Sequence, residues 1–322
     1  MPTYDKAVLT GQAQRLGFIT APFEKMSRLA EILRFLNETD GLREALALKG
    51  GTAINLTVFD LPRLSVDIDL DFGVNLDREE TRDRRNKIND LLELYMAAEG
   101  YVKKQKSKRT YILDSYVYSY TNVAGNSDNI KVEINYSLRA HVFPAVDSAS
   151  RISEAFDPFA IRTLSPIEIF ASKIVALSDR AAPRDLYDLN NMVHHGLFNE
   201  TDIGMLRKCA VFYMAVAGDI TARGLSFERM DDITPHKIRT GLSPMLRRAE
   251  RFDVEAARTR VTAFLNEHMA LTEKEAAFLQ NFTSGRYEPQ LLFEDEGIVK
   301  RIADHPMVVW RLQHIRGDRG AR

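Results

Sequence analysis

The segment at residues 65–72 reads Ser-Val-Asp-Ile-Asp-Leu-Asp-Phe, in which apolar and acidic side chains strictly alternate. Successive side chains of a strand point to opposite faces, so this alternation predicts a strand and not a helix. The apolar side chains then face a core, while Asp67, Asp69 and Asp71 lie side by side on the other face. Neighbouring carboxylates repel one another unless water or a cation neutralises them. The chain must therefore fold around a sheet with one strongly acidic face.

A divalent cation is one solution to this repulsion. Mg²⁺ and Mn²⁺ prefer oxygen ligands, so we expect Asp67 and Asp69 to bind such an ion. The alternative is a solvated strand at the edge of a sheet. The turn Gly50-Gly51-Thr52 precedes the strand, separated from it by a predicted short helix at 52–59 and a second turn. Glycines allow close approach of a ligand, and N–H groups at a helix start favour phosphate. The turn and the strand together predict a site for a triphosphate and its metal ions.

A further carboxylate is available on another alternating segment, residues 130–136. Its polar face holds Lys131, Glu133 and Asn135. A two-metal site stabilises both the attacking and the leaving oxygen, and it usually needs a carboxylate from a second strand. Glu133 is therefore the candidate for third metal ligand or general base. Two alternatives remain open: an ion pair between Glu133 and a lysine on an edge strand, and Asp71 as the third ligand.

The rest of the chain predicts two domains. Helical spacing of apolar residues covers 23–37, a charged helix covers 78–99, and strands are expected at 101–105 and 110–120. Ser165 and Glu168 have the spacing of a capping box, with Pro166 at the first helical position. From there to about residue 285 the pattern is helical. We predict a mixed α/β domain at 1–155 and a mostly α-helical domain at 156–322.

Composition excludes several classes of protein. Lys plus Arg number 44 and Asp plus Glu 45, a net charge of −1 that excludes a uniformly basic nucleic-acid coat. The single cysteine, Cys209, excludes an internal disulfide and a cysteine-based zinc site. The ten-residue apolar run at 209–218 is shorter than the roughly 20 residues of a membrane span and predicts a buried core helix. The N-terminus lacks signal-peptide features. We expect a cytoplasmic protein without a membrane partner.

Two sequence blocks resemble a known family. The first comprises Lys49-Gly50-Gly51-Thr52-Ala53-Ile54-Asn55-Leu56 and the segment 61–71. The second comprises residues 173–180, Lys-Ile-Val-Ala-Leu-Ser-Asp-Arg, and 184–189, Arg-Asp-Leu-Tyr-Asp-Leu. In this order the blocks are similar to the AbiEii/AbiGii-type nucleotidyltransferase toxins of the DNA polymerase β-like superfamily. Thr52 stands where that pattern usually has serine.

The resemblance implies an α+β fold, in which a polymerase β-like nucleotidyltransferase domain with a mixed sheet precedes a mostly α-helical domain that closes the nucleotide cleft. It also implies roles for individual residues. Nucleotide-binding residues are then Lys49, Gly50, Gly51, Thr52, Ser65 and Lys173; metal ligands are Asp67, Asp69 and Glu133; catalytic residues are Asp67, Asp69, Glu133, Lys173 and Asp185. Lys173, the lone cation on an apolar helix, can act as a point charge on a triphosphate. The alternative is a surface lysine. Arg184 and Asp188 are expected to have supporting roles.

The activity implied is metal-dependent transfer of a nucleoside monophosphate from an NTP, with release of pyrophosphate. The resemblance further implies a toxin of a toxin–antitoxin or phage-defence pair, an RNA acceptor such as the tRNA acceptor end, and a separately encoded antitoxin. Five cations at 103–109 beside Tyr101 and Tyr111, and a basic tail at 300–322, suit a phosphate backbone. The alternatives are solvated basic segments, a protein or small-molecule acceptor, and a catalytically silent module that binds an NTP or a partner.

Overall fold

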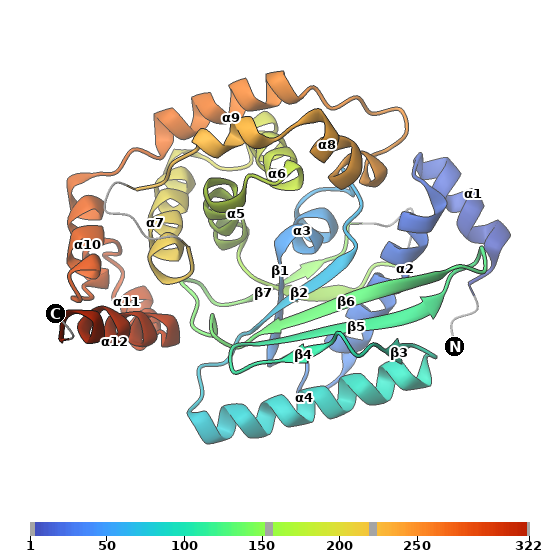
Figure 1. Ribbon diagram of the computed structural model, residues 1–322, viewed down its shortest axis with the longest axis horizontal. Helices are drawn as coiled ribbons and strands as arrows, with labels where there is room; N and C mark the ends of the chain where they lie inside the picture. Colours follow the sequence, from blue (N-terminus) through green and yellow to red (C-terminus); the bar gives the residue numbers. More distant parts are fainter. Residues whose placement is uncertain (1–3, 152–156, 219–223, 321–322) are drawn as a thin grey trace. The chain divides into compact units, whose positions relative to one another are not determined.

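The computed structural model describes residues 4–151, 157–218 and 224–320, the last five of these by backbone alone (Figure 1). The chain divides into two compact units. Unit 1 comprises Met1–Arg139, Ala145–Leu164 and Pro244–Glu250, and unit 2 comprises Ala140–Pro144, Ser165–Ser243 and Arg251–Arg322. Each unit thus contains segments that are distant in sequence. The domain boundary at 155/156 stays a prediction.

Unit 1 contains a mixed sheet, which confirms the predicted fold class. Within the described residues eight strands join in the order β3-β5-β6-β2-β1-β8-β7, and β4 pairs with β5. The strands are β1 (Leu46–Lys49), β2 (Asp67–Phe72), β3 (Val102–Lys103), β4 (Lys108–Arg109), β5 (Leu113–Thr121), β6 (Ser127–Asn135), β7 (Val146–Ala149) and β8 (Ala160–Thr163).

The acidic segment forms β2, an interior strand. It runs antiparallel to β1 and parallel to β6. Ile68, Leu70 and Phe72 are buried on one face of β2, as the alternation predicts. β2 and β6 each have a neighbouring strand on both sides, so neither of them lies at the edge of the sheet.

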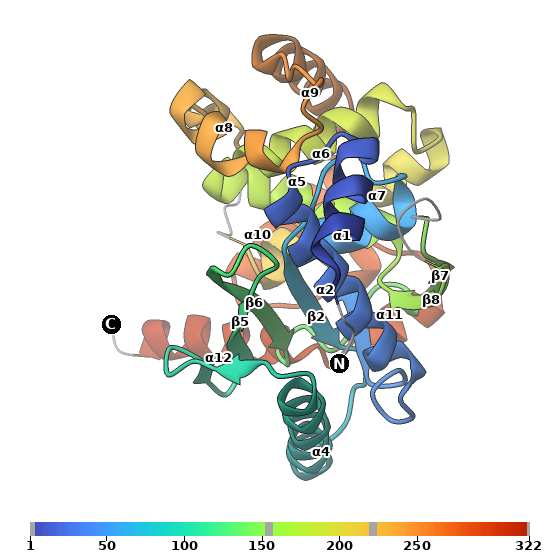
Figure 2. The same cartoon turned by 90° about the vertical axis from the view of Figure 1, so that its right-hand side faces the viewer.

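The helices of unit 1 are α1 (Lys6–Leu16), α2 (Thr20–Glu38), α3 (Gly50–Ala53) and α4 (Arg78–Ala98). Helix α2 contacts β8, α3 contacts β1 and β2, and α1 packs on α2. The short α3 continues directly into a π-helical turn, Ile54–Val58. Helix α4 begins with a capping box of Asp77 and Glu80, and it extends beside the β5–β6 hairpin (Figures 1 and 2). Phe35 of α2 stacks on Tyr95 of α4, with 3.9 Å between ring centroids.

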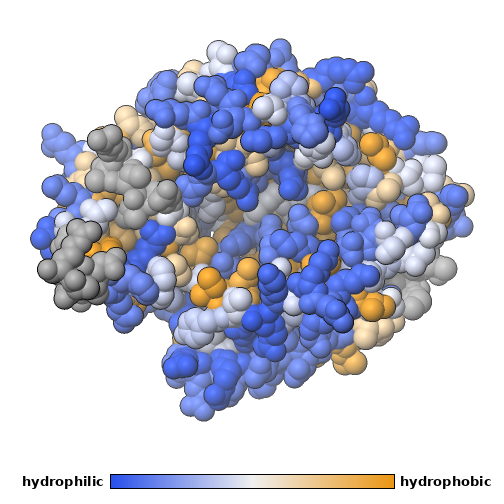
Figure 3. All heavy atoms as spheres, in the orientation of Figure 1, coloured by the Kyte–Doolittle hydropathy of each residue, from blue (hydrophilic) through white to orange (hydrophobic). Residues whose placement is uncertain are grey.

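Unit 2 is helical, as expected for the C-terminal part of the chain. Its helices are α5 (Pro166–Arg180), α6 (Pro183–His194), α7 (Glu200–Val216), α8 (Pro235–Gly241), α9 (Val254–His268), α10 (Glu273–Thr283), α11 (Glu296–Ile302) and α12 (Pro306–Gly320). Residues 209–216 of α7 are all buried, which confirms the predicted core helix. No helix in the described part of the chain is long and apolar enough to cross a membrane. The face in Figure 3 is mainly hydrophilic, with apolar side chains scattered over it.

Two local predictions are wrong. Ser165 is the N-cap of α5 and Pro166 follows it, but the Ser165 side chain forms no capping hydrogen bond. The Glu168 carboxylate instead accepts hydrogen bonds from Val142 N, at 2.7 Å, and from the Tyr213 hydroxyl, at 2.5 Å. Because Glu168 is fully buried, these tertiary partners take the place of the local capping box. The strand expected at 101–105 is also shorter, since only Val102–Lys103 pairs with β5.

Candidate active site

The register of β2 places its carboxylates beside polar side chains of both neighbouring strands. Asp69 lies opposite Lys49 of β1 and opposite Glu133 of β6. Asp67 lies opposite Lys131. Asp67 and Asp69 are partly exposed, whereas Asp71 is buried. The structure therefore brings Lys49, Asp67, Asp69 and Glu133 together on one face of unit 1.

The glycine turn lies directly against this acidic face. Gly50 has a φ of +69°, in the left-handed region that an L side chain rarely adopts. A Cβ atom on Gly50 would lie 3.0 Å from Asp69 Oδ2. The backbone at the start of α3 therefore approaches the Asp69 carboxylate as closely as glycine alone allows. The first N–H groups of a helix have no partner within the helix, so they are available to an anion at this point.

We expect Gly50→Ala to weaken both stability and activity. The left-handed backbone costs an L residue roughly 1–2 kcal/mol, and the new methyl group would also displace Asp69. Gly125→Ala is the matched control, because Gly125 has a φ of +84° with no atom within 4 Å of an added Cβ. Both variants should lose similar stability in thermal unfolding, but only Gly50→Ala should lose nucleotide transfer. Equal transfer by the two variants would show that contact with Asp69 is unimportant.

Thr52 and Ser65 lie beneath the turn and hold it to β2. The Thr52 hydroxyl is 2.9 Å from Ser65 Oγ and donates a hydrogen bond to the carbonyl of Asp67. Both side chains are buried. Their hydroxyl groups thus connect the glycine turn to the first aspartate of the strand, and a nucleotide contact by Thr52 would use its backbone N–H.

Two residues that the sequence interpretation missed also support the turn. The buried Asn55 donates a hydrogen bond from Nδ2 to Gly51 O, at 2.5 Å, and its Oδ1 accepts one from Arg63 N, at 3.3 Å. Arg63 is only 1% exposed, and a Cβ on Gly51 would lie 2.5 Å from its Nη2 atom. A buried guanidinium thus occupies the space beneath the second glycine. An arginine in a loop after proline gives no sequence signal of burial, whereas Asn55, four residues after Gly51, has the spacing of a helical neighbour.

Lysine side chains engage two carboxylates of the face. Lys49 Nζ is 2.5 Å from Asp71 Oδ1. Burial raises the pKa of the Asp71 carboxyl, and the Lys49 ammonium opposes that shift. Lys131 Nζ is 2.6 Å from Glu133 Oε2, so the ion pair considered as an alternative for Glu133 is present, on an interior strand. A metal-ligand or base role for Glu133 would require this pair to rearrange.

The donor set fits a metal ion whose coordination is completed by substrate. Asp67, Asp69, Asp71 and Glu133 carry four negative charges, against two positive charges on Lys49 and Lys131. Across the described residues, no group of three or more His, Cys, Asp or Glu side chains is arranged to hold a metal ion. Mg²⁺ is commonly bound by one or two carboxylates together with substrate phosphates. Asp67 and Asp69 meet that requirement, and the excess negative charge favours a divalent cation.

The second sequence block forms a buried charge cluster in unit 2. Lys173 Nζ of α5 is 2.7 Å from Asp185 Oδ1 and 3.0 Å from Asp188 Oδ2, both on α6. Arg180 Nε is 2.9 Å from Asp185 Oδ2. Burial of Asp185 opposes its ionisation, but the charges of Lys173 and Arg180 outweigh burial and lower the pKa of Asp185 to about 2. Lys173 is thus a buried, fixed cation and not an extended surface lysine.

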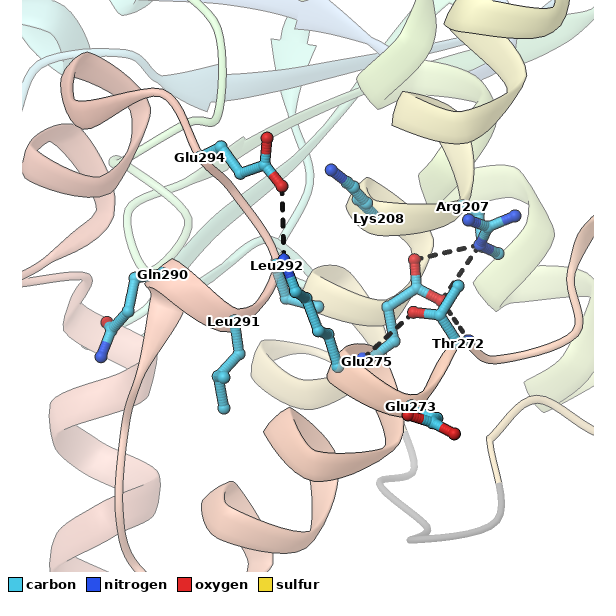
Figure 4. A pocket seen from close by; sticks show the side chains of 10 residues that line it. Arg207, Lys208, Thr272, Glu273, Glu275, Gln290, Leu291, Leu292 and Glu294 are labelled. Carbon is cyan, nitrogen blue, oxygen red and sulfur yellow. Dashed lines mark hydrogen bonds and ion pairs between the residues drawn. The ribbon is translucent and has the colours of Figure 1, made fainter.

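A separate pocket of about 370 Å³ lies in unit 2 between α7, α10 and the segment before α11 (Figure 4). Arg207 and Glu275 point toward each other at its wall, with Nε 3.0 Å from Oε1. Lys274 pairs with Glu294 at 3.4 Å. Three cations and three glutamates line this pocket, so its net charge is balanced.

A glycine turn packed on an acidic strand of a mixed sheet is the arrangement expected of a nucleotidyltransferase. The comparisons with known proteins agree. The family model for the nucleotidyl transferase AbiEii toxin of type IV toxin–antitoxin systems matches residues 34–283. The chain therefore belongs to the AbiEii nucleotidyltransferase toxin family, as its sequence blocks predict. Membership makes it a nucleotidyltransferase and a toxin, and it implies an NTP substrate and an antitoxin counterpart.

A solved structure has a similar fold. MenT4, a nucleotidyltransferase toxin from Mycobacterium tuberculosis H37Rv, matches with a TM-score of 0.61 and 17% sequence identity. The match covers 97% of this chain and 99% of MenT4. None of the curated proteins is significantly similar to the chain in sequence.

Proposed function

We propose that this toxin transfers a nucleoside monophosphate from an NTP to an RNA acceptor, the acceptor end of a tRNA, in a reaction that depends on Mg²⁺ or Mn²⁺. The observation that supports it most directly is the close approach of the Gly50 turn to the Asp69 carboxylate, where an added Cβ atom would lie 3.0 Å from Oδ2. The backbone of the glycine turn, which is the candidate phosphate-binding group, therefore lies next to Asp69, which is a candidate metal ligand. A metal ion bound there would offset phosphate charge and polarise the α-phosphate.

The residues have distinct proposed roles in the transfer. Backbone N–H groups of Gly51 and Thr52 hold the triphosphate, with Lys49 and Ser65 beside it. Glu133 accepts the proton of the acceptor hydroxyl, whose oxygen attacks the α-phosphorus. The bond from the α-phosphorus to the bridging oxygen breaks, and its electron pair leaves with pyrophosphate. In unit 2, Asp185 fixes the position of the Lys173 ammonium group at 2.7 Å, and the nucleotide contact of Lys173 stays a prediction.

The basic segment, residues 103–109, supports an RNA acceptor. Its two ends, in β3 and β4, both pair with β5, and ion pairs of Lys103 with Glu93 and of Arg109 with Asp114 anchor them. The cations between them, Lys104, Lys106 and Lys108, are exposed. A shallow groove of about 510 Å³ is lined by Lys104, Gln105, Lys106, Ser127 and Asn129. Tyr111, 73% exposed, lies close by in sequence and offers a ring on which a base could stack.

Label transfer tests the proposed reaction. The purified protein is incubated with Mg²⁺, each α-labelled NTP in turn, and total tRNA. We expect one NTP to label a tRNA band, and EDTA to abolish the label. Labelled protein, or a labelled small molecule supplied as acceptor, would contradict the RNA acceptor. NTP binding without label in any acceptor would favour a silent module.

Neutralising the basic segment 103–109 should impair the use of RNA and leave NTP binding intact. The triple variant Lys104→Gln, Lys106→Gln and Lys108→Gln loses three phosphate contacts. The slope of the logarithm of the RNA-binding constant against the logarithm of the salt concentration should therefore become smaller by roughly 2. NTP affinity should be unchanged. The control removes three exposed cations of unit 2, Lys237, Arg239 and Lys274, with the same change in net charge. Equal loss of RNA affinity in both triple variants would mean that no particular surface binds the RNA.

A further inference from the structure

The third carboxylate of β2 differs from the other two. Asp71 is 1% exposed, whereas Asp67 and Asp69 are partly exposed. Across the sheet Asp71 lies opposite Ala47 of β1 and opposite Asn135 of β6. The Asn135 Oδ1 atom accepts hydrogen bonds from Ser137 N, at 2.8 Å, and from Leu138 N, at 2.9 Å. The Asn135 side chain is thus turned toward the loop that follows β6.

Lys49 reaches Asp71 diagonally. Its register partner on β2 is Asp69, yet its ammonium group lies 2.5 Å from Asp71 Oδ1, two residues further along the strand. The Lys49 side chain is 24% exposed, whereas the Asp71 side chain is 2% exposed. The Lys49 ammonium group is therefore held by a buried carboxylate, while its side chain, which follows β1 next to Gly50, keeps part of its surface exposed. A lysine has four rotatable stem bonds, and an anchoring carboxylate lowers the entropy lost when it binds a phosphate.

We propose that Asp71 is a positioning residue: it holds the Lys49 ammonium against the glycine turn, ready for the NTP, and it is not a metal ligand. This inference rests on the proposed nucleotide contact of Lys49. It assigns the three aspartates of β2 to two tasks. Asp67 and Asp69 would bind the metal ion, and Asp71 would act on the nucleotide through Lys49.

A double-mutant cycle tests this assignment on the full chain. Lys49→Met keeps the aliphatic stem without the charge, and Asp71→Asn keeps the shape of the aspartate. Two quantities are measured by calorimetry with the NTP that wild type binds: the Kd, and the Mg²⁺ concentration that gives half-maximal NTP binding. Loss of one charged contact should raise the Kd about tenfold or more in Lys49→Met. Asp71→Asn should raise it less, and the double variant should match Lys49→Met.

The Mg²⁺ requirement separates positioning from metal ligation. Asp71→Asn should need the same Mg²⁺ concentration as wild type, whereas the comparison variant Asp69→Asn should need several-fold more. A higher Mg²⁺ requirement in Asp71→Asn, or effects of Lys49→Met and Asp71→Asn that add, would overturn the inference. If Asp71→Asn does not fold, the double variant, which leaves neither charge unpaired, is compared with Lys49→Met alone. A difference in Kd or Mg²⁺ requirement between those two would also overturn it.

The same data distinguish this inference from the proposed function. Coupled effects on NTP binding, without label in any RNA, would support the role of Asp71 and contradict the RNA acceptor. Absence of NTP binding by wild type would contradict both.

Discussion

Asparagine in place of Asp67 or Asp69 is expected to reduce nucleotide transfer on the order of a thousandfold, because each change removes a carboxylate that would bind the metal ion and so several kcal/mol of transition-state stabilisation. The change preserves side-chain size on a partly exposed strand face. The measurement is single-turnover transfer from the α-labelled NTP, with unfolding midpoints recorded for each variant. Asp67 and Asp69 should each prove essential, because both belong to the same site.

Asp60→Asn is the matched control for these variants. Asp60 lies in the exposed turn between the π-helical segment and β2, in the same unit. It loses the same charge without touching the acidic face, so its transfer rate should equal that of wild type. If both Asp67→Asn and Asp69→Asn transfer nucleotide at the wild-type rate, the acidic strand is not part of the active site. Partial loss restored by excess Mg²⁺ would be consistent with weakened metal binding.

The main elements could be predicted because their patterns are local. Alternation of apolar and acidic residues located β2, helical spacing of apolar residues located α2, and a long charged stretch located α4. The capping box at Ser165 failed because the competing partners of Glu168 are remote in sequence. The position of β2 within the sheet depends on pairing with β1 and β6, which lie on either side of it in the chain. No local pattern specifies such pairing.

Residue types in the site could be predicted, but their contacts could not. The sequence interpretation grouped the three aspartates of β2 by spacing alone. Burial separates Asp71 from the other two, and it depends on the strands and loops packed around β2. In the same way, Arg63 is polar and follows a proline, yet it fills the space beneath Gly51. Such packing depends on contacts between residues that are distant in the sequence. Local conformational propensity and hydrophobic pattern do not specify these contacts.

Loss of Lys173 is expected to cause the largest fall in stability. Lys173→Ala would leave the buried carboxylates of Asp185 and Asp188 without the ammonium group that lies 2.7 and 3.0 Å from them. Removal of one partner from a buried ion pair costs about 3–5 kcal/mol. The free energy of unfolding, measured by denaturant titration at neutral pH, should fall by that amount. Lys274→Ala is the matched control, because Lys274 is an exposed lysine in a surface pair and should cost under about 1 kcal/mol.

The pH dependence of this loss follows from the pKa of Asp185. The folded-state pKa is lowered from 3.8 to about 2. Because the unfolded chain takes up the proton first as pH falls, the native state gains stability from Asp185 above pH 4 and loses it as the pH falls toward 2. That contribution amounts to about 2 kcal/mol at neutral pH. Removing Lys173 should raise the pKa of Asp185, so this carboxylate takes up its proton at a higher pH in the variant, and protonation relieves part of the cost of burying its charge. The stability difference between wild type and Lys173→Ala should therefore shrink between pH 4 and pH 2. A difference that stays constant over this range would mean that Lys173 stabilises the helices by packing its stem and not by its charge.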